Sequence, residues 1–221
     1  MSHEQSVKVW DPLLRIFHWS LVLLFIISYA TGEEESAIHA WSGYGIVALL
    51  IFRFIWGVVG PKYARFTNFV YSPAEIMAYS RDLLVGNAKR YIGHNPLGGL
   101  MVVALLLSLS MTTFTGMMLY GAEEGKGPLA GVMQAELSVP QLIATAQADD
   151  DEYESYEYEH GMGSMARHED EEEHELLEEV HEFFANFTVF LIVIHIMGVM
   201  FESFVHRESL VSAMFSGYKK T

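Results

Sequence analysis

Four histidines lie within or at the edge of long apolar stretches: His18, His39, His181 and His195. An ionisable side chain at membrane depth is energetically costly, and such residues commonly mark a functional site. A b-type haem is held without covalent bonds, and its iron can take one neutral imidazole on each axial side. Two such haems would use all four histidines, although a single membrane histidine can equally serve as an interhelical hydrogen-bonding group.

The composition excludes several other cofactors and partners. The chain has no cysteine, which excludes disulfides, thiolate metal sites, iron–sulfur clusters and covalently attached c-type haem. It has 13 Lys and Arg but 28 Asp and Glu, so a basic nucleic-acid-binding surface is not expected. An apolar content of 51% together with a net charge of −15 indicates that apolar and acidic residues occupy separate regions.

Four stretches are long enough to cross a bilayer, for which about 20 apolar residues suffice. They cover residues 12–32, 37–59, 97–120 and 183–205. Each must be a helix, because an isolated strand in lipid would leave its backbone unpaired. We therefore predict an all-α membrane protein, in which residues 1–221 form one domain built on a four-helix bundle. Pro61 should end the second span, while Asn95 and Pro96 should cap and begin the third.

The basic residues set the orientation of these spans. Eleven of the thirteen lie in the N-terminal segment, the 60–96 connection, the C-terminal tail or the adjoining ends of the spans. By the positive-inside rule, both termini are predicted to be cytoplasmic. The acidic residues show the reverse distribution, because 22 of the 28 lie on the opposite side.

The orientation places the histidines at two depths. His181 and His195 are 14 residues apart in the fourth span, which corresponds to about 21 Å along one face of a helix. His18 precedes Thr31, near the outer end of the first span, by about 20 Å, whereas His39 lies at the outer end of the second. We therefore predict an outer pair, His39 and His181, and an inner pair, His18 and His195, each binding one haem iron.

Haem propionates require cations, and two arginines are suitably placed. Arg53 follows His39 by 14 residues, so it should face inward at the depth of the inner haem. Arg15 precedes His18 by one helical turn. Both are candidate haem-binding residues.

The connection between the third and fourth spans, residues 121–178, is predicted to be an acidic loop on the outer side. Its first part could carry a short interfacial helix, and its second part, from Asp149 onward, is acidic, rich in tyrosine and expected to be mobile. This region could be a solvated cap or a surface that attracts a basic soluble partner. Weak metal binding by its histidines is a further option: His160, His168 and His174.

Long sequence segments resemble the bacterial cytochrome b561 family, and within it the b-type cytochrome subunits associated with nickel–iron hydrogenases. The matching segments are VKVWDPLLRIFHWSL, HAWSGYGIVALLIFRFIWGVVGPKYARF, RYIGHNPLGGLMVV and VHEFFANFTVFLIVIHIMGVMFESFVHRESLVSAMFSGYK. The resemblance implies a multi-pass protein of the bacterial inner membrane with two bis-histidine haems b. The ligand positions of the family fall on the same four histidines.

The resemblance also implies electron exchange between the membrane quinone pool and a periplasmic redox partner. A quinone site is expected near one haem, and three side chains line the cytoplasmic edge: His94, Glu202 and His206. The run GAEEGKGPLAG with its acidic continuation is similar to relatives paired with small c-type cytochromes. The expected partner is thus a basic c-type cytochrome or a hydrogenase docking on the acidic outer face.

Two other functions are compatible with the same sequence. The chain could be an enzyme in its own right, a quinone-linked superoxide oxidase of the same fold. It could also be a cation-handling membrane protein without a redox role, in which histidines and acidic residues bind metal. We favour an electron-transfer subunit over a self-sufficient enzyme.

Overall fold

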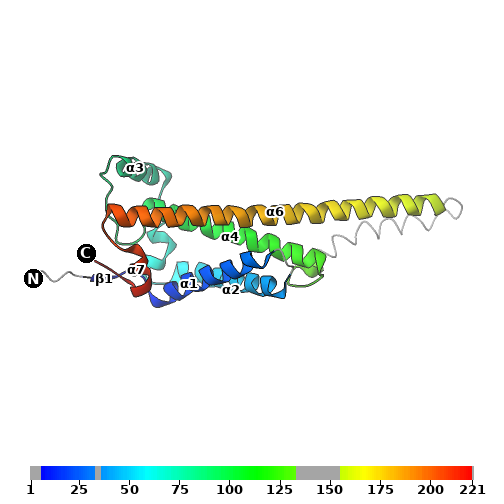
Figure 1. The fold of residues 1–221 in the computed structure, drawn as a ribbon, viewed down its shortest axis with the longest axis horizontal. Coiled ribbons are helices and arrows are strands. Elements are labelled where there is room, and N and C mark those ends of the chain that lie inside the picture. The colour runs from blue at the N-terminus through cyan, green and yellow to red at the C-terminus, as the bar shows by residue number, and fades with distance from the viewer. Residues whose placement is uncertain (1–5, 33–35, 133–154, 221) are drawn as a thin grey trace, which may run out of the picture. The chain divides into compact units, whose positions relative to one another are not determined.

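The computed structural model describes residues 6–32, 36–132 and 155–220, with the backbone alone over 155–173 and at 220. The described residues are mainly helical (Figure 1). Their helices are α1 (Pro12–Ala30), α2 (Ala37–Val59), α3 (Pro73–Leu84), α4 (Pro96–Glu123), α6 (Ser155–Val205) and α7 (Leu210–Ser216), with short 3₁₀ turns η2 (Lys62–Ala64) and η3 (Phe66–Asn68). Two three-residue strands, β1 (Ser6–Lys8) and β2 (Tyr218–Lys220), complete the description.

Four helices in the described part are long and apolar enough to cross a membrane. They are Pro12–Ala30, Ala37–Val59, Pro96–Glu123 and, within α6, His174–Val205. Their positions agree with the four predicted spans to within a few residues, except that the fourth begins earlier. The prediction of an all-helical membrane protein is therefore confirmed.

The predicted helix ends depend on local capping groups. The side chain of Asn95 accepts a hydrogen bond of 2.7 Å from the backbone N–H of Gly98, and so caps α4 as predicted. Helix α2 ends at Val59, with Gly60 as its cap and Pro61 behind it, as predicted. Helix α3 was not predicted, although Ser72 and Glu75 form a reciprocal capping box at its start.

Helix α6 differs most from expectation. The acidic residues from 155 to 178 were predicted to be part of a mobile loop, but their backbone continues the membrane helix without a break. Charge density suggested an unfolded segment, yet Glu, Met and Ala are good helix formers, and a helix already nucleated in the membrane needs no new nucleus. Residues 133–154 of the predicted loop lie outside the described part of the chain.

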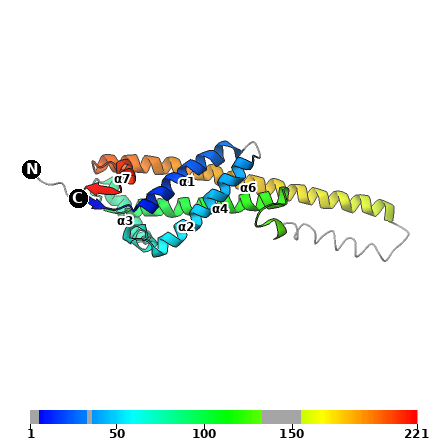
Figure 2. The ribbon, with the colours of Figure 1, turned by 90° about the horizontal axis from the view of Figure 1, so that it is seen from below.

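The chain divides into two compact units. The first unit contains residues 1–110 and 186–221, and the second contains residues 111–185. In the first unit, α1 and α2 pack side by side (Figures 1 and 2). Their shared core includes Leu14, Phe17, Ile46 and Leu50. Polar contacts within this unit link parts of the other two membrane helices: Ser108 of α4 bonds Thr188 of α6 at 2.7 Å, and Tyr29 of α1 donates to Asn186 of α6 at 2.9 Å.

The two ends of the chain meet in the first unit. Strands β1 and β2 pair in an antiparallel register that places Val7 opposite Lys219 (Figure 2). The backbone N–H groups of Val9 and Trp10 also donate to the carbonyl of Gly217, at 2.8 and 3.1 Å. The described ends of the chain therefore lie side by side in the first unit.

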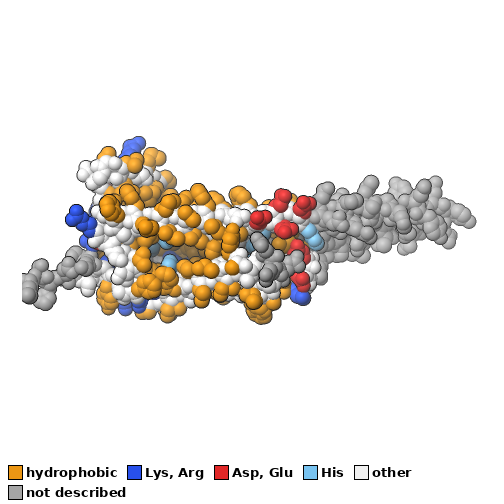
Figure 3. All heavy atoms as spheres, viewed as in Figure 1, with side chains coloured by type: hydrophobic (Ala, Val, Ile, Leu, Met, Phe, Trp, Pro, Cys, Tyr) orange, Lys and Arg blue, Asp and Glu red, His pale blue; other side chains and the backbone are white. Residues whose placement is uncertain are grey.

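The surface of the first unit is suited to lipid. Large apolar side chains of α1 and α2 are exposed, among them Ile16, Leu23, Ile26, Ile51 and Val58. In Figure 3 the apolar side chains form a broad band, and Lys and Arg side chains gather at the end of this unit that carries α3 and the termini. An exposed apolar band of this kind is typical of a membrane-embedded surface.

Candidate haem sites

The predicted inner ligands, His18 of α1 and His195 of α6, belong to the first unit. They lie close enough for each imidazole to influence the other electrostatically. Both rings are half-buried, and the buried Nδ1 atom of His18 has no hydrogen-bond partner among the described residues. The two histidines thus belong to the same unit, and a ring nitrogen of His18 has no hydrogen-bond partner there, while their pairing on one haem remains a prediction.

His39 of α2 is held in a defined tautomer. Its Nδ1 lies 2.8 Å from the backbone carbonyl oxygen of Ser28 and 3.4 Å from the hydroxyl of the same residue. A carbonyl oxygen only accepts, so Nδ1 must carry the hydrogen. In this tautomer Nε2 is the ring nitrogen that can act as a metal ligand, and a carbonyl that accepts from the other nitrogen is typical of metal-ligating histidines.

His181 of α6, in the second unit, has the same chemistry. Its Nδ1 lies 3.0 Å from the backbone carbonyl oxygen of Thr112 and 3.2 Å from the hydroxyl of Thr115. Gly116 faces the ring so closely that a Cβ atom there would lie 2.8 Å from Cε1 of His181. The ring thus occupies space that a larger residue at position 116 would take, and Nε2 is the ring nitrogen that could ligate a metal.

The predicted pairing of the outer histidines remains a prediction. His39 belongs to the first unit and His181 to the second, and the structure describes each unit by itself. The common feature is chemical, because each ring donates Nδ1–H to the backbone carbonyl of a neighbouring helix.

Arg53 of α2 is a buried cation without a matching anion. Its side chain is only 2% exposed, and its guanidinium lies 4.9 Å from the ring centroid of Phe66 and 5.4 Å from that of Phe69. The described hydrogen bond of this group runs from Nη1 to the carbonyl of Ala64, at 3.1 Å. No carboxylate among the described residues lies within ion-pair distance of it. A buried charge normally has a partner, so this site is suited to an anionic group such as a propionate.

Arg15, the other predicted propionate ligand, has a different environment. Its Nη1 donates to the backbone carbonyl of Phe215, and its buried Nε has no partner among the described residues. The contact ties α1 to the C-terminal helix α7. A structural role is therefore visible for Arg15, whereas its predicted role toward haem is not tested by this contact.

His94 precedes α4 and lies in an aromatic box in the first unit. Its ring centroid is 4.7 Å from that of Trp10 and 4.9 Å from that of Phe69. Burial, together with the charges of Arg53 and Lys219, lowers the pKa of His94 to about 3, so the ring is neutral. Its buried Nδ1 lacks a partner among the described residues. Lys219, which the sequence did not single out, is brought to this region by strand pairing.

The loop histidines do not form a described metal site. Among the described residues, no group of three or more His, Asp or Glu side chains is arranged to hold a metal ion. Of the three histidines considered for this role, the side chains of His160 and His168 lie outside the described residues, and His174 is half-buried.

Comparison with known proteins identifies the family. The family model described as prokaryotic cytochrome b561 matches residues 9–217. The chain belongs to this family. As a cytochrome b561 family member with four candidate membrane-crossing helices, it is a multi-pass membrane cytochrome b that binds b-type haem and takes part in electron transport.

Similar cytochromes in other bacteria carry the name "Probable Ni/Fe-hydrogenase B-type cytochrome subunit". The protein from Rhizobium leguminosarum bv. viciae is 25% identical over 244 residues, which cover 97% of this chain and 89% of the relative. Those from Cupriavidus necator and Rhodobacter capsulatus are 23% and 24% identical, again over 97% of this chain and over 87% and 81% of their own lengths. No solved structure was found to match the cytochrome.

Proposed function

We propose that this cytochrome holds two haems b and carries electrons across the bacterial inner membrane, between the quinone pool and a periplasmic redox partner. The observation that carries the proposal is the shared state of His39 and His181. Each ring donates its Nδ1–H to a backbone carbonyl, which makes Nε2 the ring nitrogen that can ligate iron, although the two residues lie 142 positions apart in the chain. This is the state that an axial ligand of haem iron needs.

In this proposal His18 and His195 hold the inner haem, and His39 and His181 hold the outer one. The haem iron supplies one-electron redox chemistry by cycling between its ferric and ferrous forms. The chain's own contribution is to orient the four imidazoles and to surround the sites with apolar side chains. Arg53 offers a buried positive charge for a propionate of the inner haem, and Arg15 is a weaker candidate for the same role.

The orientation supports contact with a partner outside the cytoplasm. Basic residues gather on the side of the paired termini, which we infer to be cytoplasmic from the positive-inside rule. Three acidic residues near the outer end of the fourth span are exposed: Glu175, Glu178 and Glu179. A basic c-type cytochrome would be attracted to such a surface. The relatives' names support a hydrogenase as the alternative partner.

Quinone is proposed to react at the cytoplasmic side of the first unit, where His94, Glu202 and His206 lie. His94 is neutral and has a buried ring nitrogen without a partner in the described structure. Such an atom is available to a polar group of a bound molecule. The apolar, exposed surface of the first unit would give a lipid-soluble quinone access from the bilayer.

The proposal is tested by a reduced-minus-oxidised spectrum and haem quantification on the purified protein. We expect two low-spin haems b per chain. His18→Ala and His195→Ala should each remove one haem, and His39→Ala and His181→Ala should each remove the other. A colourless protein, or a single haem that survives all four substitutions, would refute the assignment. Rapid superoxide-dependent quinone reduction by the isolated protein would instead favour the oxidase alternative.

A further inference from the structure

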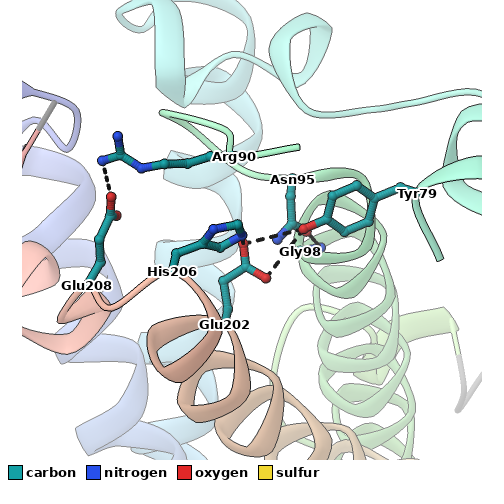
Figure 4. Close-up of polar contacts among 7 residues, drawn as sticks. All are labelled: Tyr79, Arg90, Asn95, Gly98, Glu202, His206 and Glu208. Atoms are coloured by element: carbon teal, nitrogen blue, oxygen red, sulfur yellow. Dashed lines mark hydrogen bonds and ion pairs between the residues drawn. The ribbon is translucent and has the colours of Figure 1, made fainter. Parts of the chain in front are cut away.

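Three titratable side chains meet at the basic end of the first unit (Figure 4). The carboxylate of Glu202 accepts from the hydroxyl of Tyr79, with both oxygens at 3.4 Å, and one of these oxygens lies 3.2 Å from Nε2 of His206. Tyr79 comes from α3 and is buried, with 4% of its surface exposed. The side chains of Glu202 and His206 are 16% and 13% exposed. The cluster thus joins a buried phenol to two groups that retain limited contact with water.

Glu202 lies on the ligand-bearing face of α6. It follows His195 by seven residues, which is within about 20° of two full helical turns and about 10 Å along the helix axis. The carboxylate therefore lies between the proposed inner haem ligand and the basic surface of the first unit. It is placed where a redox reaction near the inner haem would exchange protons with the aqueous phase.

The charges around Glu202 leave it able to exchange a proton. The nearby Arg90 forms its ion pair with Glu208 (Figure 4). No Lys or Arg of the described residues lies within ion-pair distance of Glu202, although the charges of Glu208 and Glu202 act on Lys219 of β2. Burial raises the pKa of Tyr79, with contributions from Glu202 and Tyr91, so the phenol stays protonated. The carboxylate of Glu202 thus contacts a phenol and an imidazole, and no arginine of the described residues pairs with it.

On the basis of the proposed function, we propose that Glu202 transfers protons between the quinone site and the cytoplasm, with His206 as its link to water and Tyr79 as its positioning residue. Reduction of a quinone consumes two electrons, supplied by the proposed electron transfer, and two protons. For each proton, the O–H bond of the Glu202 carboxyl breaks and a new O–H bond forms on a quinone oxygen. His206 then returns a proton to the carboxylate. Quinol oxidation runs through the same steps in reverse.

The test measures haem reduction by decylubiquinol and by menadiol in purified protein over a range of pH. Glu202→Gln keeps the size and an acceptor for Tyr79 but cannot take up a proton. We expect it to slow quinol-dependent haem reduction by about 10- to 100-fold and to flatten its pH profile. Haem content and reduction by dithionite should not change. Glu202→Asp should recover part of the rate.

Glu208→Gln is the matched control, because it removes a neighbouring acid that is paired with Arg90 rather than with the cluster. It should keep the rate and pH profile of the wild type. Tyr79→Phe removes a hydrogen-bond donor to the carboxylate, so the pH profile should move to higher pH. This variant tests the inference even if Glu202→Gln is poorly assembled.

Two outcomes would overturn the inference, and they differ in what they say about the proposed function. If Glu202→Gln retains the wild-type rate and pH profile, the proton-transfer role is wrong while electron transfer stands. If neither quinol reduces the haem of the wild type, the proposed quinone-linked function itself is wrong, and the role of Glu202 falls with it.

Discussion

In the second unit, Nδ1 of His181 lies 3.0 Å from the backbone carbonyl oxygen of Thr112. This contact joins residues that are 69 positions apart and determines which ring nitrogen carries the hydrogen. It therefore determines which nitrogen can bind iron. Helix α4, which carries Thr112, also limits the space around the ring. Gly116 lies one turn after Thr112 on this helix and faces His181.

Gly116→Ala should displace the imidazole of His181. The added Cβ would lie 2.8 Å from Cε1 of that ring, a separation that requires the ring or the helix to move. We expect partial or complete loss of one haem, measured by pyridine haemochrome quantification. Gly131→Ala is the control in the same unit, since its Cβ would meet no atom within 4 Å. Equal haem content in both variants would contradict the proposed role of His181.

Arg53→Leu should shift the midpoint potential of one haem to a more negative value. Removing a buried positive charge destabilises the additional electron of the reduced form, by on the order of 50 mV for a charge about 10 Å away. Redox titration monitored by absorbance measures the shift. Arg81, an exposed residue of α3, provides the control, and Arg81→Leu should leave both potentials unchanged. If the haem midpoint potentials of the two variants are equal, Arg53 does not interact with a haem.

Gly217→Ala should destabilise the junction of the two termini. Gly217 has a φ of +88°, and a Cβ there would lie 2.7 Å from the carbonyl oxygen of Trp10. We expect a loss of about 2–3 kcal/mol in the free energy of unfolding, seen as a lower temperature for loss of the haem absorbance. Gly86→Ala separates the cost of the positive φ from the cost of the steric clash, because Gly86 has a φ of +75° but open space around it. This control should cost about 1 kcal/mol.

Electron transfer to a basic soluble partner should weaken as salt rises. Attraction between exposed charges is screened beyond about 8 Å at physiological ionic strength. Transfer to horse-heart cytochrome c, a basic probe, measures the effect by stopped-flow absorbance. Replacing the exposed Glu175, Glu178 and Glu179 by Gln should slow transfer at low salt. Asp82→Asn, at an exposed position of α3, is the control, and an equal effect there would exclude docking on the acidic part of α6.

Local sequence was enough to predict the membrane helices and several of their ends. The hydropathy of a span and the cap at its start depend on residues that are close together in the chain. The spans and the cap at Asn95 could therefore be predicted without tertiary contacts. The acidic part of α6 was missed because its charge was interpreted as disorder. The segment is rich in helix-forming residues and directly precedes a membrane helix, and both features indicated that it would be helical. Helix α3 was missed although Ser72 and Glu75 provided a capping signal.

The sequence by itself determined where apolar helices form, which histidines they carry and how charge is divided between their ends. These properties follow from residue type and from spacing along a single helix. Only the tertiary structure decided that Ser28 and Thr112 accept from the two outer histidines, that Phe66 and Phe69 enclose Arg53, and that Tyr79 meets Glu202. Each of these contacts joins different segments of the chain, and several join residues far apart in sequence. Side-chain packing determines them, and helical periodicity carries no information about it.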